Sequence, residues 1–191
     1  MNYAEGMKIK QAVSFVLMLA AAVSIWAVEI DGKIGKNEYA SSQALSNGIF
    51  TLYWQVEGDK IHIAIEAISQ GWVAIGLDPG AVMSNSDMIF GLVAPDGKTT
   101  AIDAWSTGLF GPHPADTELG GADSILASAG SREGNKVVFE FTRLLDTKDK
   151  FDKAIALDKP MKLIWATGPN LVWTAKHDKK GSAKVSFGGA K

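Results

Sequence analysis

The chain has 191 residues, of which 47% are hydrophobic and 21% charged, a balance typical of one folded globular domain. Its formal net charge of −2 and its lack of Lys/Arg clusters argue against a nucleic-acid-binding surface, because a phosphate backbone requires concentrated positive charge. The absence of cysteine excludes disulfides, thiolate metal sites and covalent attachment of c-type haem. Any redox group must therefore be held by coordination and burial alone.

The N-terminus has the pattern of a signal peptide. Lys8 and Lys10 precede an uncharged apolar run over residues 12–26, and Ala27 supplies a small residue for cleavage. Met7 opens a more compact version of the same signal and is a second candidate start. We therefore expect an exported protein, either periplasmic or secreted.

Two alternatives concern the processing of this segment. Cleavage after Ala22 would also satisfy the preference for small residues, although residues 28–32 already have the character of the domain. An uncleaved anchor would have only the uncharged stretch 11–28, which is short for a bilayer core that needs roughly 20 apolar residues. We predict a signal peptide over residues 1–27 and a single mature domain over 28–191, in contact with a membrane only if the first segment is not cleaved.

The mature sequence consists of short apolar runs separated by Gly, Asp, Asn and Pro, without a long amphipathic helix. Gly58 and Asp59 separate the first two runs as a hairpin turn would, and a long irregular loop follows Trp105. The pattern predicts an all-β fold, an antiparallel two-sheet β-sandwich of immunoglobulin-like type with about nine or ten strands. The expected strands are 49–56, 61–65, 71–77, 87–93, 99–105, 124–128, 136–142, 161–166 and 183–187.

Residues that commonly carry catalysis are sparse. No G-x-S-x-G motif and no obvious pair of catalytic acids is found, so we do not expect an enzyme. The three histidines, His62, His113 and His177, lie outside the spacings of common zinc sites. His62 is expected on the outer face of its strand, and His177 in a loop. His113 lies between two prolines in the long loop, where it could approach a ligand.

Three charged residues interrupt or end apolar strands. Asp87, Asp103 and Arg143 are candidates for a buried polar network in which an Asp–Arg pair fastens loops to the sandwich. A ligand-binding role for the same residues is the alternative.

The most unusual segment covers residues 71–91, in which a strand, a Gly/Pro-rich turn and a polar loop precede a strand that begins with Asp87. Met83 lies in that loop among glycine, serine and asparagine. Most methionines fill a core, so a methionine in such a loop is notable.

The order and spacing of several segments resemble the DOMON domain, a β-sandwich found in extracellular haem-binding or sugar-binding modules. The resemblance covers residues 30–187, nearly all of the mature chain. The segments are IDGKIGKNEYA (30–40), GWVAIGLDPGAVMSNSDMIFG (71–91), TAIDAW (100–105), PADTELGGADSIL (114–126), FEFTRLLDTKDKFD (139–152), IWATG (164–168) and H-x-x-x-G (177–181).

The resemblance to the cytochrome members implies a non-covalent haem b, with its iron, at one end of the sandwich. Their axial ligands are a methionine from the loop before the D-x-x-x-G strand and a histidine from the loop before the last strand. These positions fall on Met83 and His177. Apolar residues next to these loops are expected to line the porphyrin, chiefly Trp72, Met88, Phe90 and Trp173, with Trp105 and Trp165 as further candidates, and Lys176, Lys179 and Lys180 could meet the propionates.

The function implied is that of an electron-transfer module. An iron with two axial protein ligands has no open position for substrate, which suits electron exchange with a separate, unidentified redox protein. The alternative is a carbohydrate- or small-ligand-binding module without haem, in which exposed tryptophans stack on sugar rings. A third interpretation is an interaction domain within a larger exported complex.

Overall fold

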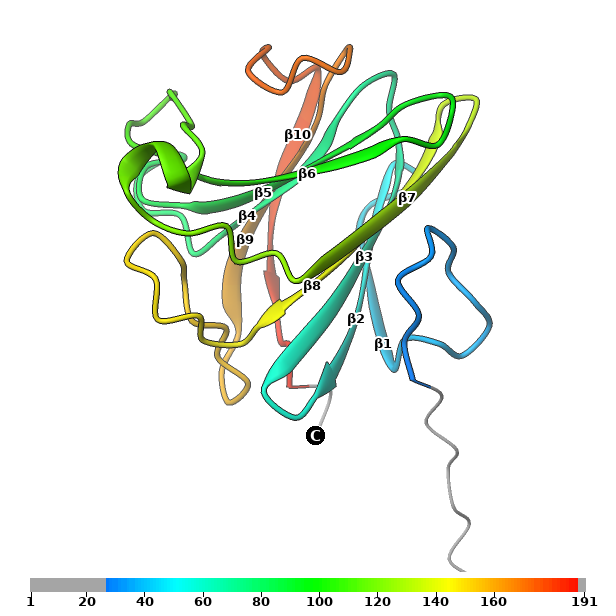
Figure 1. Ribbon diagram of the computed structural model, residues 1–191, viewed down its shortest axis with the longest axis horizontal. Helices are drawn as coiled ribbons and strands as arrows, with labels where there is room; N and C mark the ends of the chain where they lie inside the picture. Colours follow the sequence, from blue (N-terminus) through cyan, green and yellow to red (C-terminus); the bar gives the residue numbers. More distant parts are fainter. Residues whose placement is uncertain (1–26, 189–191) are drawn as a thin grey trace, which may run out of the picture.

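Two five-stranded antiparallel sheets pack face to face in the computed structural model, which describes residues 27–188 (Figure 1). The first sheet has the order β1-β2-β3-β8-β7, with β1 (Ser41–Ser46), β2 (Phe50–Glu57), β3 (Lys60–Ile68), β8 (Lys136–Leu144) and β7 (Ala127–Glu133). The second has the order β10-β9-β4-β5-β6, with β10 (Lys179–Val185), β9 (Met161–Thr167), β4 (Val73–Leu77), β5 (Asp87–Val93) and β6 (Thr99–Trp105). The expected β-sandwich is confirmed.

Helical structure is limited, within residues 27–188, to the short 3-10 helix η1 (Asp116–Leu119) in the long loop after β6. No helix in this part of the chain has the length and apolar character required to cross a membrane. The predicted signal peptide lies outside the described residues except for Ala27, so it stays a prediction.

The strands that differ most from the expected ones are edges of the sheets. β1 (SSQALS) was not predicted, β7 lies at 127–133 rather than 124–128, and β10 begins at Lys179 rather than at residue 183. All three strands are edges, with one hydrogen-bonded neighbour each. Their residues are largely Ser, Ala, Gly and Lys, which have weak β-propensity, so pairing with the neighbouring strand defines them rather than their own pattern.

The core between the sheets is built by alternation along each strand. Val137, Phe139 and Phe141 of β8 point inward, and Ile61, Ile63 and Ile65 of β3 do the same. Phe139 and Phe141 stack with ring centres 5.6 Å apart.

The outer face of β3 and β8 is covered by the segment that precedes β1. The Glu140 carboxylate accepts hydrogen bonds from the Gly32 backbone N–H and the Tyr39 hydroxyl, both at 2.6 Å. His62 lies on this outer face, as expected, but it is buried, with its Nδ1 2.8 Å from Thr142 Oγ1. The expected position of His62 on the outer face of its strand is confirmed.

The predicted polar network is present at one end of the sandwich. The Arg143 guanidinium donates to Asp87 Oδ2 at 2.7 Å and lies 3.6 Å from Asp152 Oδ1, with all three side chains buried. Asp103 accepts a hydrogen bond of 2.8 Å from the Ser124 backbone N–H. These contacts join β8 of one sheet to β5 of the other and to both long loops nearby.

The two sheets approach each other closely at Gly91. A methyl group at this position of β5 would lie 2.2 Å from Cγ of Phe139 across the core. We expect Gly91→Ala to lower the free energy of unfolding by about 1–3 kcal/mol, because overpacking displaces the ring. Urea denaturation measures the change. Adding Phe139→Leu to the Gly91→Ala chain should recover part of the loss, whereas a Gly91→Ala chain as stable as the wild type would contradict this packing.

Candidate functional site

A cavity of about 1210 Å³ lies on the outer face of the second sheet, away from the core between the sheets. Its floor is formed by residues of β4, β5 and β9 whose side chains alternate with those of the core. Small residues leave room on part of this floor, namely Ala74, Gly76 and Ala166. The volume slightly exceeds the roughly 300–1,000 Å³ typical of small-molecule pockets. The cavity is therefore suited to a large, flat and mainly apolar group.

Three loops form the walls: 78–86 between β4 and β5, 106–115 after β6, and 168–178 between β9 and β10. In Figure 1 the last of these, in orange, rises above the sheet beside β10. The walls thus come from segments far apart in the sequence, and only the sheet brings them together.

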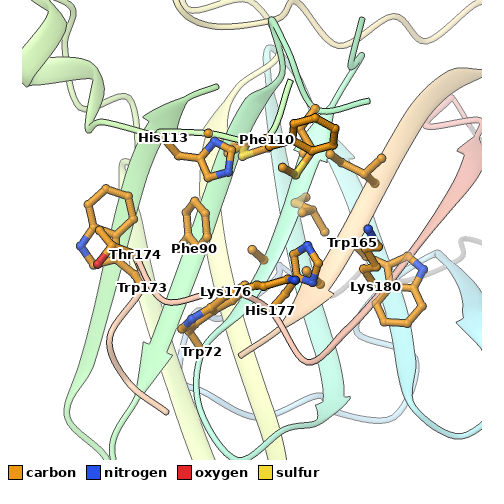
Figure 2. Close-up of a pocket in the computed structure, with 18 of the residues that line it drawn as sticks. Trp72, Phe90, Phe110, His113, Trp165, Trp173, Thr174, Lys176, His177 and Lys180 are labelled. Carbon is orange, nitrogen blue, oxygen red and sulfur yellow. The ribbon is translucent and has the colours of Figure 1, made fainter. Parts of the chain in front are cut away.

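Aromatic rings surround Phe90 of β5. Trp72 and Trp173 meet it edge-on, with ring centres at 5.3 and 5.4 Å, and His113 lies 6.3 Å away (Figure 2). Trp72 is held closely against the chain, because a Cβ at Gly168 would lie 2.2 Å from its indole nitrogen. The wall on this side is consequently apolar and well packed.

Three cavity-lining side chains that could bind a metal come from three different loops, namely Met83, His113 and His177. Met83 is half-buried and packs against the Trp72–Phe90 cluster. Figure 2 shows the two imidazoles on separate loops of the cavity wall. A thioether and two imidazoles in an apolar cavity form a donor set suited to haem iron.

The loop that carries Met83 is strained. Val82, immediately before it, has a φ of 58°, and Asn85 has a φ of 54°. Left-handed backbone is unusual for a β-branched residue such as valine, and such strain is often found at functional sites.

Both cavity histidines favour the neutral form. Burial lowers the pKa of His113 below its ordinary value of 6.5, and the nearby His177 lowers it further. Burial, and then the positive charge of Lys180, lowers the pKa of His177. Because neutral imidazole is the form that binds a metal, both rings are ready to do so at neutral pH. Nδ1 of His113 is also buried without a hydrogen-bond partner.

The structure brings together all six residues singled out from the sequence: Met83, His177, Trp72, Met88, Phe90 and Trp173 all line this cavity. Its location differs from the expectation, because it lies on the outer face of a sheet and not at one end of the sandwich. That sheet is apolar on both faces, and loops cover its outer face.

The remaining candidates divide between cavity and core. Trp105 packs beside Phe151, with ring centres 6.0 Å apart, and is not part of the cavity wall. Trp165 belongs to the core but also reaches the cavity, because Gly181 leaves room for its indole. Lys176 and Lys180 line the cavity, and Lys179 does not.

Two contributors were missed or undervalued. Phe110 lines the cavity although it is 80% exposed, and nothing in the sequence distinguished it from other loop residues. His113 had a signal, its position between Pro112 and Pro114, but the sequence could not show which way the loop folds.

The shared cavity of the histidines predicts a measurable coupling. In the protein without cofactor, His177→Gln should raise the pKa of His113, because a like positive charge is removed, but not to its ordinary value, because burial persists. NMR titration of the imidazole C–H signals measures this. His62→Asn, on the other sheet, is the matched control. An effect of His62→Asn equal to that of His177→Gln would show that the two cavity rings do not interact as described.

Comparison with known proteins identifies related sequences and folds. Residues 46–168 match the family model of the DOMON domain. A mouse protein, DBH-like monooxygenase protein 1 (Mus musculus), is 27% identical over 121 residues, 62% of this chain. The chain spans only 18% of that relative's length.

Two similar solved structures are cytochrome domains. The cytochrome b domain of pyranose dehydrogenase from Coprinopsis cinerea has a TM-score of 0.55 and 14% identity, covering 74% of this chain and 78% of that one. The cytochrome domain of Myriococcum thermophilum cellobiose dehydrogenase has a TM-score of 0.51 and 12% identity, covering 74% and 77%. At these identities the likeness shows a shared fold.

Proposed function

The chain belongs to the DOMON domain family, and on that premise we propose that it is an exported electron-transfer module that binds haem b through Met83 and His177. The observation that carries the proposal is one apolar cavity that contains a thioether and neutral imidazoles among aromatic rings. The naming of two similar structures as cytochrome domains supports it. The proposed export rests on the N-terminal sequence pattern.

The residues of the cavity fit a haem group. Small floor residues and the rings of Trp72, Phe90 and Trp173 would accommodate a flat macrocycle. Lys176 and Lys180 supply positive charge that would pair with propionate carboxylates. Haem b bound here would supply reversible one-electron chemistry.

The side chains proposed as ligands also determine what the site can do. If Met83 and His177 both held the iron of the haem, no position would be left for substrate, so the site would exchange electrons and not transform a ligand. A neutral thioether and an apolar surround both favour the ferrous state, which raises the reduction potential. The electron donor or acceptor would be a separate protein.

The sugar-binding alternative receives less support from the positions of the tryptophans. Within residues 27–188, Trp54, Trp72 and Trp165 are buried, and Trp105 and Trp173 are half-buried. None of these five forms an exposed stacking platform. A small apolar ligand in the cavity is the form of the alternative that the geometry still accommodates.

An absorption spectrum of the full chain after haem addition tests the proposal. We expect sharp α and β bands upon reduction with dithionite, as for a low-spin haem with two strong ligands. Met83→Leu and His177→Ala should each abolish these bands. A protein that takes up no haem would overturn the proposal, and carbohydrate binding by that colourless protein would favour the alternative.

A His113 variant is included in this experiment because His113 lines the same cavity. We expect His113→Ala to retain the low-spin bands. If instead His113→Ala abolishes them and Met83→Leu does not, two histidines are the ligands and the assignment of Met83 is wrong. His62→Asn, outside the cavity, controls for the general effect of removing an imidazole.

A further inference from the structure

A second cluster of chemically active side chains lies apart from the cavity, at the end of the sandwich where β5 begins and β6 ends. Asp87, Asp103 and Asp152 each offer a carboxylate oxygen, and these three oxygens all lie within 4.8 Å of one another. Asp87 and Asp103 come from neighbouring strands, whereas Asp152 comes from the loop 145–160. In Figure 1 that loop and the loop after β6 both gather at this end.

A fourth buried carboxylate, Asp116, lies beside this cluster. An antiparallel bridge pairs Ala104 with Ala115, which places Asp103 and Asp116 next to each other on the bridged segments. Asp116 is fully buried, and neither of its carboxylate oxygens has a hydrogen-bond partner. The charges of Asp103, Asp152 and Asp87 all act on it, which is consistent with a shared location.

Unpartnered oxygens are the distinctive feature of the cluster. Besides both oxygens of Asp116, Oδ1 of Asp87, Oδ1 of Asp103 and both oxygens of Asp152 are buried without a hydrogen-bond partner. Buried carboxylates in proteins are normally hydrogen-bonded or paired. Arg143 compensates only part of this negative charge, since its guanidinium donates to Oδ2 of Asp87 at 2.7 Å and lies 3.6 Å from Oδ1 of Asp152.

The charges do not balance. If all four carboxylates are ionised, the single guanidinium of Arg143 leaves an excess of three negative charges. The Lys153 backbone N–H donates to Asp87 Oδ2, while the Lys153 ammonium lies 5.2 Å from the centre of the Trp105 ring. The Asp149 carboxylate accepts hydrogen bonds from the backbone N–H groups of Ala122 and Phe151.

This imbalance of charge affects the protonation of the carboxylates. Burial and the neighbouring carboxylates raise the pKa of Asp103 to about 7 and that of Asp116 to about 8. Without a cation, the cluster would therefore hold protons near neutral pH. A divalent cation would remove most of the excess charge instead.

We infer that Asp87, Asp103, Asp116 and Asp152 form a calcium-binding site that joins β5, β6 and the two adjacent loops. The donors are all hard carboxylate oxygens, which suit Ca²⁺ or Mg²⁺ and not zinc or copper. Ca²⁺ is favoured because it accepts several protein carboxylates in flexible geometry, whereas Mg²⁺ usually takes one or two and keeps its waters. This site is independent of the proposed haem.

The site would also affect the cavity indirectly. Asp116 follows His113 by three residues in the loop after β6. An ion bound by Asp116 would therefore anchor the loop that places His113 and Phe110 at the cavity wall.

Calcium binding by the full chain, first treated with a chelator and desalted, tests the inference. Calorimetric titration with CaCl₂ should give one bound ion per chain. At a Ca²⁺ concentration about 100-fold above Kd, Tm should rise by roughly 5–10 °C. MgCl₂ should act more weakly, and KCl at equal ionic strength should give no comparable shift.

Substitutions of single carboxylates test which residues bind the calcium ion. Asp116→Asn and Asp103→Asn should each abolish the calcium-dependent rise in Tm, while Asp158→Asn, in an exposed loop, should retain it. If a cluster variant does not fold, the number of Ca²⁺ ions bound per wild-type chain still decides whether the site exists. The inference is overturned if the wild type takes up no Ca²⁺, or if the shift survives in both cluster variants. A chain that ignores Ca²⁺ but becomes more stable as pH falls would show that protons balance the cluster.

Discussion

The second sheet is apolar on both faces, and much of the molecule follows from the need to cover it twice. One face packs on the first sheet through Ile75, Ile89 and Leu163. The other presents Ala74, Met88 and Phe90, which only loops are available to cover. Loops are less regular than a sheet, so they leave a cavity in the cover. The same demand for burial that stabilises the sheet therefore creates the candidate site.

The loops need positions as precise as those of the strands if the cavity is to bind anything. The buried Arg143–Asp87 pair contributes by joining β8 to the start of β5, close to where the Met83 loop ends. The acidic cluster around it gathers the loop after β6 and the loop before β9. A buried ion pair adds little net stability of its own, but removing one partner leaves a buried charge unpaired. Its value here lies in specifying where the loops attach.

Sequence reasoning was most accurate where a strand has a strong apolar pattern of its own. β5 and β6 have the predicted bounds, and the near-continuous apolar runs of β4 and β5 carry the signal of a sheet covered on both faces. It was least accurate for three edge strands, β1, β7 and β10, which have weak patterns of their own. The cavity also lies elsewhere than the expected site. The apolar runs of β4 and β5 show that both faces of the sheet are buried, but they do not show what covers the outer face.

The sequence by itself determined the fold class, the central strands and the absence of thiol chemistry. The resemblance to a family selected Met83 and His177, since a lone loop methionine and histidine carry no local signal. Only the tertiary structure decided that His113 joins them and that Asp116 and Asp152 join Asp87 and Asp103. The physical reason is the same in both cases. Alternation along a strand is a local property, but the path of a loop depends on contacts with residues distant in the sequence.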